Sequence, residues 1–337
     1  MTTLISAIVV FGILILFHEM GHFTVAKLVD IKVDEFSVGM GPQLLQFRKG
    51  ETLYSLRALP IGGYIKMEGE DHSSSDERAF SNRPLWARIA VVAAGAVMNF
   101  ILGFLLFIIM ISMVPSIPQP VVGELVNGMP AQQAGLLPGD RIIQLNNYKV
   151  HIQKDVQYFL AKNEGKPINV KVLRNGKILD FKLTPRLNEE YRRYMIGYTA
   201  KSEKKTFFNV LINAYYETAF LTKAIVNSLG DLFTGKLGLN QMSGPVGIVK
   251  EIGGAAQAGI GSLLFIAALI SINLGIFNLL PIPALDGSRI IFLIIEGIRR
   301  KPINPEKEGL VHLIGFAMLM LLLIFVTFND ITRIWGS

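Results

Sequence analysis

The stretch LILFHEMGHFTVAK, residues 14–27, decides the fold, because it places ionisable side chains at the end of an apolar run. Residues 1–17 contain no Asp, Glu, Lys or Arg, and His18, Glu19 and His22 follow directly. Acidic and histidine side chains are costly in a lipid-embedded helix and usually have a function there. We therefore expect residues 3–25 to form a membrane-spanning helix that carries a functional site.

The composition of the chain agrees with a membrane protein. Hydrophobic residues make up 51% of the 337 residues, more than an ordinary soluble protein contains. The net charge of +7 could indicate nucleic-acid binding. However, the basic residues are scattered and no basic helix accompanies them, so we expect no nucleic-acid partner. The chain has no cysteine, so any metal site must use His, Asp or Glu.

Four stretches are long enough to cross about 30 Å of hydrocarbon, which takes roughly 20 helical residues. They are residues 3–25, 88–114, 258–281 and 309–329. The first could be a secretory signal peptide, but it has no basic n-region and ionisable residues stand where the cleavage site belongs. We therefore predict a polytopic α-helical membrane protein with four transmembrane helices.

Basic residues near the span ends predict the orientation. Lys and Arg flank the 26–88 connection and lie in the 286–308 connection, whereas the opposite side offers little beyond Lys250 and Arg333. The positive-inside rule therefore places both connections in the cytoplasm and both termini outside. By the helical rise, His18 lies about 22 Å along the first span, so we expect the site within the bilayer, toward the cytoplasmic side.

The spacing of the two histidines indicates a zinc site. His18 and His22 are four residues apart and share one face of a helix, while Glu19 beside them can act on a water molecule at the metal. A catalytic zinc usually has three protein ligands, so one more is needed. Asp286 is the candidate, because it follows a charge-free window and spans one and three run in the same direction. It therefore emerges at the same membrane face as the histidines.

Several motifs, in this order along the chain, resemble the site-2 protease family, and more narrowly the bacterial RseP-type intramembrane zinc proteases. They are HEMGH at 18–22, LPIGGYIKMEGE at 59–70, GAVMN at 95–99, a PDZ-like stretch between spans two and three, SGPVGI at 243–248 and NLLPIPALDG at 278–287. The resemblance implies a catalytic acid/base at Glu19 and zinc ligands at His18, His22 and Asp286. It also implies substrate contacts by Asn99, Asn273 and Asn278.

The chain departs from this family's pattern in three places. Many members have Pro where this chain has Ala96, and a second Gly where it has Ser288. Some members carry two tandem PDZ domains, whereas residues 124–251 have room for one and a helical segment. A further alternative concerns Asn99 and Asn278, which could make simple interhelical hydrogen bonds instead of substrate contacts.

The membrane core is expected in two halves, residues 1–114 and 251–337. Residues 33–68 alternate and turn like a β-meander, and the resemblance implies a membrane-associated sheet in this region. An edge of such a sheet, including Gly62 and Gly63, could bind an unwound substrate by strand addition. The alternative is a cytoplasmic hairpin that only seals the site.

Between the two halves we expect a PDZ-like α+β domain at 115–200 and an amphipathic helical segment at 201–250, both on the outer side. The domain begins after the linker PSIPQP and shows a strand, a short helix, a PGD turn, a strand, a helix at 154–163 and two strands around an Asn-Gly turn. It could exclude substrates with bulky outer domains, bind C-terminal tails or act as a spacer. Residues 206–234 predict one or two surface helices, because a fifth span would contain Glu217, Lys223 and Asp231.

Together these patterns predict an intramembrane zinc endopeptidase of the bacterial cytoplasmic membrane, with the lipid bilayer as its environment. Its expected substrates are transmembrane segments of single-pass membrane proteins. The resemblance implies that another protease shortens them first, and that they include anti-sigma factors or remnant signal peptides.

Two other classes compete with the protease. The first is a membrane-anchored PDZ adaptor with a structural zinc, which would need a fourth protein ligand. The second is a metal or proton transporter, which usually shows repeated spans, and we find no such repeat in the sequence. No role is assigned to His151 or His312, and His72 is expected in a cytoplasmic loop.

Overall fold

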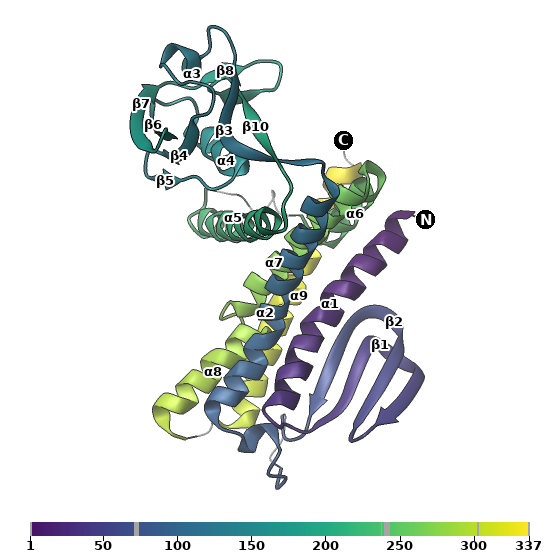
Figure 1. Cartoon of the computed structure of the whole chain (residues 1–337). Coiled ribbons are helices and arrows are strands. Elements are labelled where there is room, and N and C mark those ends of the chain that lie inside the picture. The colour runs from purple at the N-terminus through teal and green to yellow at the C-terminus, as the bar shows by residue number, and fades with distance from the viewer. Residues whose placement is uncertain (1, 71–73, 237, 239–242, 302, 336–337) are drawn as a thin grey trace. The chain divides into compact units, whose positions relative to one another are not determined.

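The computed structural model describes residues 2–70, 74–236, 238, 243–301 and 303–335. The chain divides into two compact units, one made of residues 1–107 and 221–337 and the other of residues 108–220. Figure 1 shows the helices and strands of both units. His72, expected in a loop, lies outside the described residues.

Four of the described helices are long and apolar enough to cross a membrane, and they match the four predicted spans. They are α1 (Thr2–Leu28), α2 (Leu85–Met113), α7 (Ile260–Leu279) and α9 (Pro305–Trp335). The segment predicted as one or two amphipathic helices forms a single helix, α5 (Phe207–Phe233). Among the described helices, α5 is not one of those long and apolar enough to cross a membrane, so the fifth-span alternative gains no support.

Among the described residues, the first unit also contains two shorter α-helices and the 3₁₀ helix η1 (Phe80–Asn82). α6 (Pro245–Ala258) is separated from α7 by Gly259, whose φ of 117° interrupts the helix. α8 (Asp286–Arg299) follows α7 after a short turn, in a region that the sequence analysis treated only as a connection. Buried side chains of α1, α2, α6 and α7 form one core cluster: Ala7, Val10, Leu14, Leu102, Ile252 and Ala267.

The β-structure predicted at 33–68 is present, but its order differs from a meander. It consists of two long antiparallel strands, β1 (Val33–Lys49) and β2 (Thr52–Met67). The first half of β1 lies between the two halves of β2, since Glu35 is paired with both Leu53 and Lys66. Non-local pairing of this kind places the segment 63–67 at one side of the sheet, next to α1.

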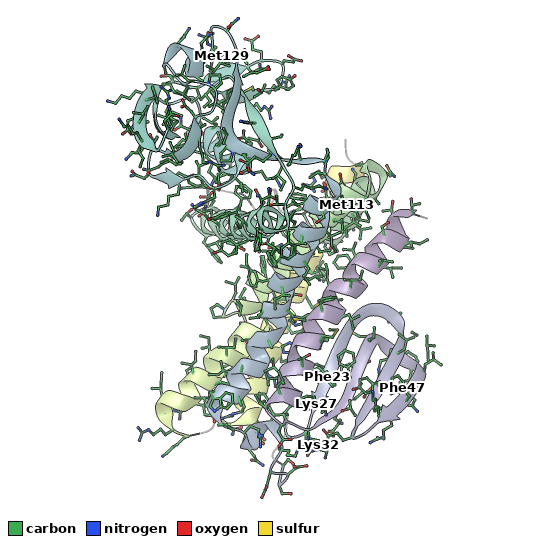
Figure 2. All side chains as sticks on the ribbon, viewed as in Figure 1. Phe23, Lys27, Lys32, Phe47, Met113 and Met129 are labelled. Atoms are coloured by element: carbon green, nitrogen blue, oxygen red, sulfur yellow. The ribbon has the colours of Figure 1, made fainter. Side chains whose placement is uncertain are left out.

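Aromatic packing joins α1 to this sheet. The ring of Phe23 on α1 lies 5.2 Å from the ring of Phe36 and 6.0 Å from that of Tyr54. Tyr54 in turn stacks on Phe47 at 5.1 Å. Figure 2 labels Phe23 on α1 and Phe47 on the sheet beside it. The C-terminal half of α1 is therefore fixed by side-chain contacts on its sheet side.

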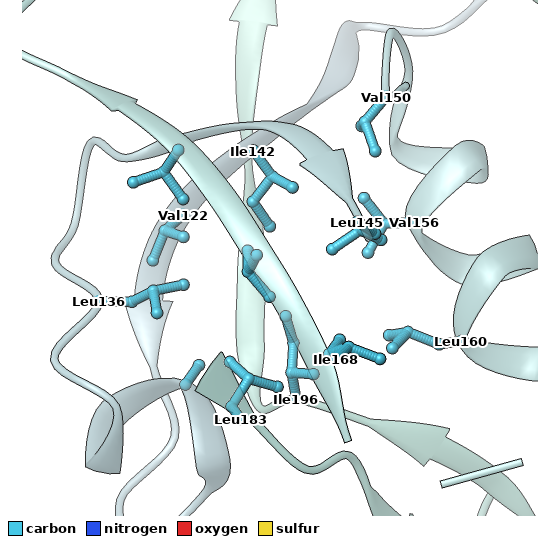
Figure 3. Packing of buried hydrophobic residues seen from close by; sticks show 13 residues of the cluster. Val122, Leu136, Ile142, Leu145, Val150, Val156, Leu160, Ile168, Leu183 and Ile196 are labelled. Carbon is cyan, nitrogen blue, oxygen red and sulfur yellow. The ribbon is translucent and has the colours of Figure 1, made fainter. Parts of the chain in front are cut away.

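The second unit is an α+β domain whose sheet has the strand order β10–β3–β4–β6–β7, with β5 beside β4. The predicted succession of elements is confirmed by β3 (Ser116–Leu125), α3 (Pro130–Gln133), β4 (Arg141–Leu145), α4 (Gln153–Asn163), β6 (Ile168–Arg174) and β7 (Lys177–Leu183). The predicted linker PSIPQP was wrong, however, because residues 116–120 belong to β3, which pairs with β10. The sequence analysis did not identify β5 (Tyr148–Lys149), β8 (Arg186–Asn188), β9 (Arg193–Met195) or β10 (Tyr198–Lys204). Figure 3 shows the buried core, in which Ile142, Leu145 and Val156 pack between the sheet and α4.

Candidate metal centre

The structure brings the three predicted zinc ligands together in the first unit. The Nε2 atoms of His18 and His22 lie 3.2 Å apart. The Oδ2 atom of Asp286 lies 3.3 Å from His18 Nε2 and 3.4 Å from His22 Nε2. In the described part of the chain, this is the one group of three or more His, Asp or Glu residues whose ligand atoms could hold a metal.

These distances fit a zinc ion. A tetrahedral zinc with bonds of about 2.0–2.2 Å keeps its ligand atoms about 3.3–3.6 Å apart. The two edges to Asp286, at 3.3 and 3.4 Å, lie in this range, and the edge between the histidines, at 3.2 Å, is just below it. Asp286 Oδ2 is buried and has no hydrogen-bond partner among the described residues, as expected for an atom that binds a metal. Two imidazoles and one carboxylate are also a known ligand set for catalytic zinc, with the fourth position left for water.

Helix α2 orients both histidines through three residues spaced four apart: Val91, Gly95 and Asn99. The backbone carbonyl oxygen of Val91 lies 2.8 Å from His22 Nδ1. A Cβ atom on Gly95 would collide with the His22 ring and lie 2.6 Å from His18 Cε1, so only glycine leaves room for both rings. The Asn99 amide lies 3.3 Å from His18 Nδ1. The two histidines thus pack against one face of α2.

Two asparagines meet the His18 ring on the side away from the metal position. Asn278 of α7 also reaches His18 Nδ1, at 3.4 Å. When Nε2 binds a metal, Nδ1 carries the proton and donates it to an oxygen. A 180° flip of the Asn99 amide, which exchanges oxygen and nitrogen, places Oδ1 at this N–H and gives that buried, otherwise unpartnered oxygen its acceptor role. Asn273 is half-buried on α7 and is not one of the two amides at His18.

The turn between α7 and α8 places Asp286 at the first residue of α8. A Cβ on Gly287 would collide with the carbonyl oxygen of Leu280 and come within 2.5 Å of the carbonyl carbon of Leu279. Glycine at this position therefore lets α8 start close to the end of α7. Ser288, where the family often has glycine, is buried and donates its hydroxyl to the Leu285 carbonyl oxygen at 2.8 Å. The turn accommodates this departure with a hydrogen bond.

Glu19 lies beside the ligands and against the β-sheet. A Cβ on Gly63 would lie 3.2 Å from Glu19 Cγ and 2.9 Å from the Ser37 carbonyl oxygen, so the backbone of β2 approaches Glu19 closely. Gly62 has a φ of 89°, which favours glycine. The Glu19 carboxylate interacts electrostatically with the ionisable side chains of four residues: His18, His22, Asp286 and Glu70. The predicted catalytic residue and the predicted sheet edge therefore meet in one place.

A cavity of about 1330 Å³, lined by both polar and apolar residues, adjoins the centre on the α8–α9 side, and its wall includes Asp286. Two ion pairs line it: Arg289 of α8 with Glu70, and Arg88 of α2 with Glu296 at 2.5 Å. The sequence analysis missed Val91, Gly95 and these pairs as parts of the site. Gly95 and Glu70 did lie within quoted motifs, GAVMN and LPIGGYIKMEGE, and this was the signal that could have identified them.

Comparisons with known proteins give consistent matches over almost the whole chain. The pattern of Peptidase family M50 matches residues 6–322. A Clostridium acetobutylicum protein provisionally named a zinc metalloprotease is 43% identical over 329 residues, which cover 97% of each chain. The regulator of sigma-W protease RasP of Bacillus subtilis is 35% identical over 419 aligned positions, covering 99% of each chain. Since 419 positions exceed the 337 residues here, the Bacillus protein carries segments that this chain lacks.

Proposed function

The chain belongs to peptidase family M50, and we propose that it cleaves single-pass membrane proteins within their transmembrane segments. It is a zinc metallopeptidase with helices long and apolar enough to span a membrane. The observation that carries the proposal is the position of the ligands. His18 and His22 lie on α1, one of the four candidate spans, and Asp286 joins them at the start of α8. A metal centre on such a helix has access to peptide bonds that lie at membrane depth.

The roles of the residues follow from their positions. His18, His22 and Asp286 would hold the zinc, and the hydrogen bonds at both Nδ1 atoms keep the two imidazoles oriented. Zinc, when bound, polarises a carbonyl group and lowers the pKa of water toward about 7. Glu19 accepts a proton from the attacking water and returns it to the leaving amine nitrogen.

An unwound substrate needs partners for its backbone, because a transmembrane helix satisfies its own hydrogen bonds. The segment 63–67 of β2 supports a role in this step. It pairs with β1 through Gly63 with Val38 and Ile65 with Phe36, and Gly63 also lies near Glu19. We assign Gly62 and Gly63 to the binding of an extended substrate by strand addition, and the side-chain amides of Asn273 and Asn278 to hydrogen bonds with the same substrate. Asn99 is fully buried, which favours an orienting role at His18 over direct substrate contact.

The finer proposals concern location and substrates. The charge pattern supports a bacterial cytoplasmic membrane protein with both termini and the second unit outside and the metal centre toward the cytoplasm. The second unit, read as PDZ-like, would act as a filter that rejects substrates with bulky outer domains. The name of the Bacillus relative supports anti-sigma factors as one substrate class, and remnant signal peptides are another. Both would be shortened first by another protease.

The test of the activity is cleavage of a short transmembrane peptide without an outer domain by the detergent-purified full chain. We expect cleavage that stops when a zinc chelator is added and returns with zinc. The matched control is Glu19→Gln, which should retain zinc and cleave nothing. A protein that keeps stoichiometric zinc but cleaves no member of a panel of transmembrane sequences would contradict the proposal and favour a non-catalytic adaptor.

Two substrate series test the finer proposals. Peptides with ester bonds in place of single amides near the cleavage site remove one backbone donor at a time. Strand addition predicts losses at alternate positions only, and a uniform response would contradict it. In a second series the same transmembrane segment carries no outer domain or a compact folded one. A filter predicts cleavage of the first only, whereas equal cleavage would indicate tail binding or a spacer.

A further inference from the structure

The turn that carries Asp286 contains a backbone conformation that needs outside support. Ala284, two residues before the ligand, has a φ of 75°, in the left-handed region that residues other than glycine, Asn and Asp rarely adopt. Such conformations persist only when the surrounding structure holds them. Within the turn, the Ile282 N–H bonds to Leu280 O at 2.7 Å and the Leu285 N–H to Ile282 O at 3.1 Å. The N–H of Ala284 makes its hydrogen bond to a residue outside the turn.

Helix α9 supplies the missing partner. The backbone N–H of Ala284 donates to His312 Nδ1 at 3.0 Å. One turn later on the same helix face, Gly315 lies against Pro283, so closely that a Cβ there would collide with the proline ring and lie 2.8 Å from its carbonyl oxygen. His312 and Gly315, three residues apart, therefore clamp two consecutive residues of the turn.

Two further side chains lie close to the His312 ring. Its Nε2 lies 3.8 Å from Glu308 Oε1, four residues earlier on α9. The ring also meets Phe292 of α8 edge-on, at 5.6 Å between ring centres. Because Nδ1 accepts a hydrogen bond, the neutral ring must carry its proton on Nε2, the atom that faces the glutamate. Among the described residues His312 is not a member of the ligand cluster, so it acts at a distance from the metal position.

We propose that His312 is a positioning residue, which holds the left-handed turn at Ala284 and thereby aims Asp286 at His18 and His22. Without the Nδ1 acceptor, the Ala284 N–H loses its partner and the turn can relax to an ordinary conformation. The Asp286 carboxylate then moves relative to the two imidazoles, and zinc is bound more weakly. This inference concerns the metal centre alone and does not depend on the substrate proposed above.

The test compares zinc affinity in two variants of the full chain, measured by competition with a chelator in detergent. His312→Leu introduces an apolar side chain of similar size and removes the acceptor, and we expect affinity to fall about 10-fold or more. His312→Asn retains an acceptor at the position of Nδ1, and we expect it to stay close to the wild type. Substitution by cobalt gives a second readout, because its visible spectrum reports ligand geometry. We expect a changed spectrum for the leucine variant only.

A second pair of variants covers the case in which His312→Leu does not fold. Gly315→Ala places a methyl group against Pro283 and displaces the turn without removing any polar group. Gly309→Ala on the same helix meets no atom within 4 Å and serves as the matched control. We expect weaker zinc binding for Gly315→Ala and wild-type zinc affinity for Gly309→Ala. Wild-type zinc affinity in both His312→Leu and Gly315→Ala, or an equal loss in His312→Asn and His312→Leu, would overturn the proposal.

Discussion

The backbone carbonyl oxygen of Val91 lies 2.8 Å from the Nδ1 atom of His22. A carbonyl can only accept, so this contact fixes the proton on Nδ1 and leaves the Nε2 lone pair for the metal. The main chain of α2 thus determines the tautomer of His22, a proposed metal ligand on α1. The metal centre depends on how closely these two helices approach, and not only on the residues that bind zinc.

Gly95→Ala tests this dependence. The added methyl group would collide with the His22 ring and displace His18, so we expect a severe loss of zinc binding while the helices still form. The measurement is the zinc content of the purified protein after dialysis against a weak chelator. Gly12→Ala on α1 meets no atom within 4 Å and is the matched control, for which we expect full zinc content. A Gly95→Ala protein with stoichiometric zinc would show that the helices separate easily at this point.

The two asparagines at His18 can be told apart by their effects. Asn99 is fully buried, so Asn99→Leu should weaken zinc binding about 10-fold or more by removing the acceptor for His18 Nδ1. Asn99→Asp, which keeps an oxygen there, should restore most of it. If Asn278 contacts substrate, Asn278→Leu should instead raise the KM for a transmembrane peptide more than it lowers zinc affinity. Unchanged zinc affinity in Asn99→Leu would show that the orienting role is wrong.

Part of this site could be predicted from sequence because its signals are local. The spacing of His18 and His22 fixes a shared helix face, and charge-free windows locate the spans that bring Asp286 to the same side. The role of Gly95 depends on the distance between two helices, and the order of the sheet depends on pairing between residues such as Glu35 and Lys66. Neither can be derived from local periodicity.

Other quoted motifs show the same limit. No structural role could be predicted for SGPVGI at 243–248, because the residue that it contacts lies near the other end of the chain. In the structure the buried carboxylate of Asp330 accepts the Gly247 N–H at 2.7 Å, and Gly244 leaves room for it. Likewise α8 was not predicted, and no role was assigned to His312, since a single histidine in an apolar span has no pattern that indicates its partner.

Metal removal should lower stability through the same ligands. With zinc at about 100 times its Kd, binding to the folded state contributes about 2.7 kcal/mol. We therefore expect a chelator to lower the Tm of the wild-type protein in detergent, and zinc to restore it. In Asp286→Ala, which lacks one of the three proposed ligands, the chelator should change Tm little. An equal chelator effect on both proteins would mean that zinc stabilises the fold at some other place.

The pH dependence of stability should include a contribution from the sheet beside the site. Burial raises the pKa of Glu35, but hydrogen bonds from Ser55, Arg57 and Tyr64 outweigh it and lower the pKa to about 2. Because this value lies below the usual one of about 4.5, the carboxylate stabilises the folded state above that pH. The contribution is lost as the pH falls from about 4.5 toward 2. Glu35→Gln removes it, together with the ion pair to Arg57 at 2.9 Å.

We expect Glu35→Gln to reduce the free energy of unfolding by about 1–3 kcal/mol at pH 7, and the difference from wild type to shrink as the pH approaches 2. Thermal unfolding in detergent at a series of pH values measures this difference. Glu77→Gln, at an exposed position of the same unit, is the control and should follow the wild type. A difference that stays constant from pH 7 to pH 2 would show that Glu35 acts through packing rather than through its charge. Since Tyr64 shares this network and follows Gly63, the outcome also bears on how firmly the sheet edge is held beside Glu19.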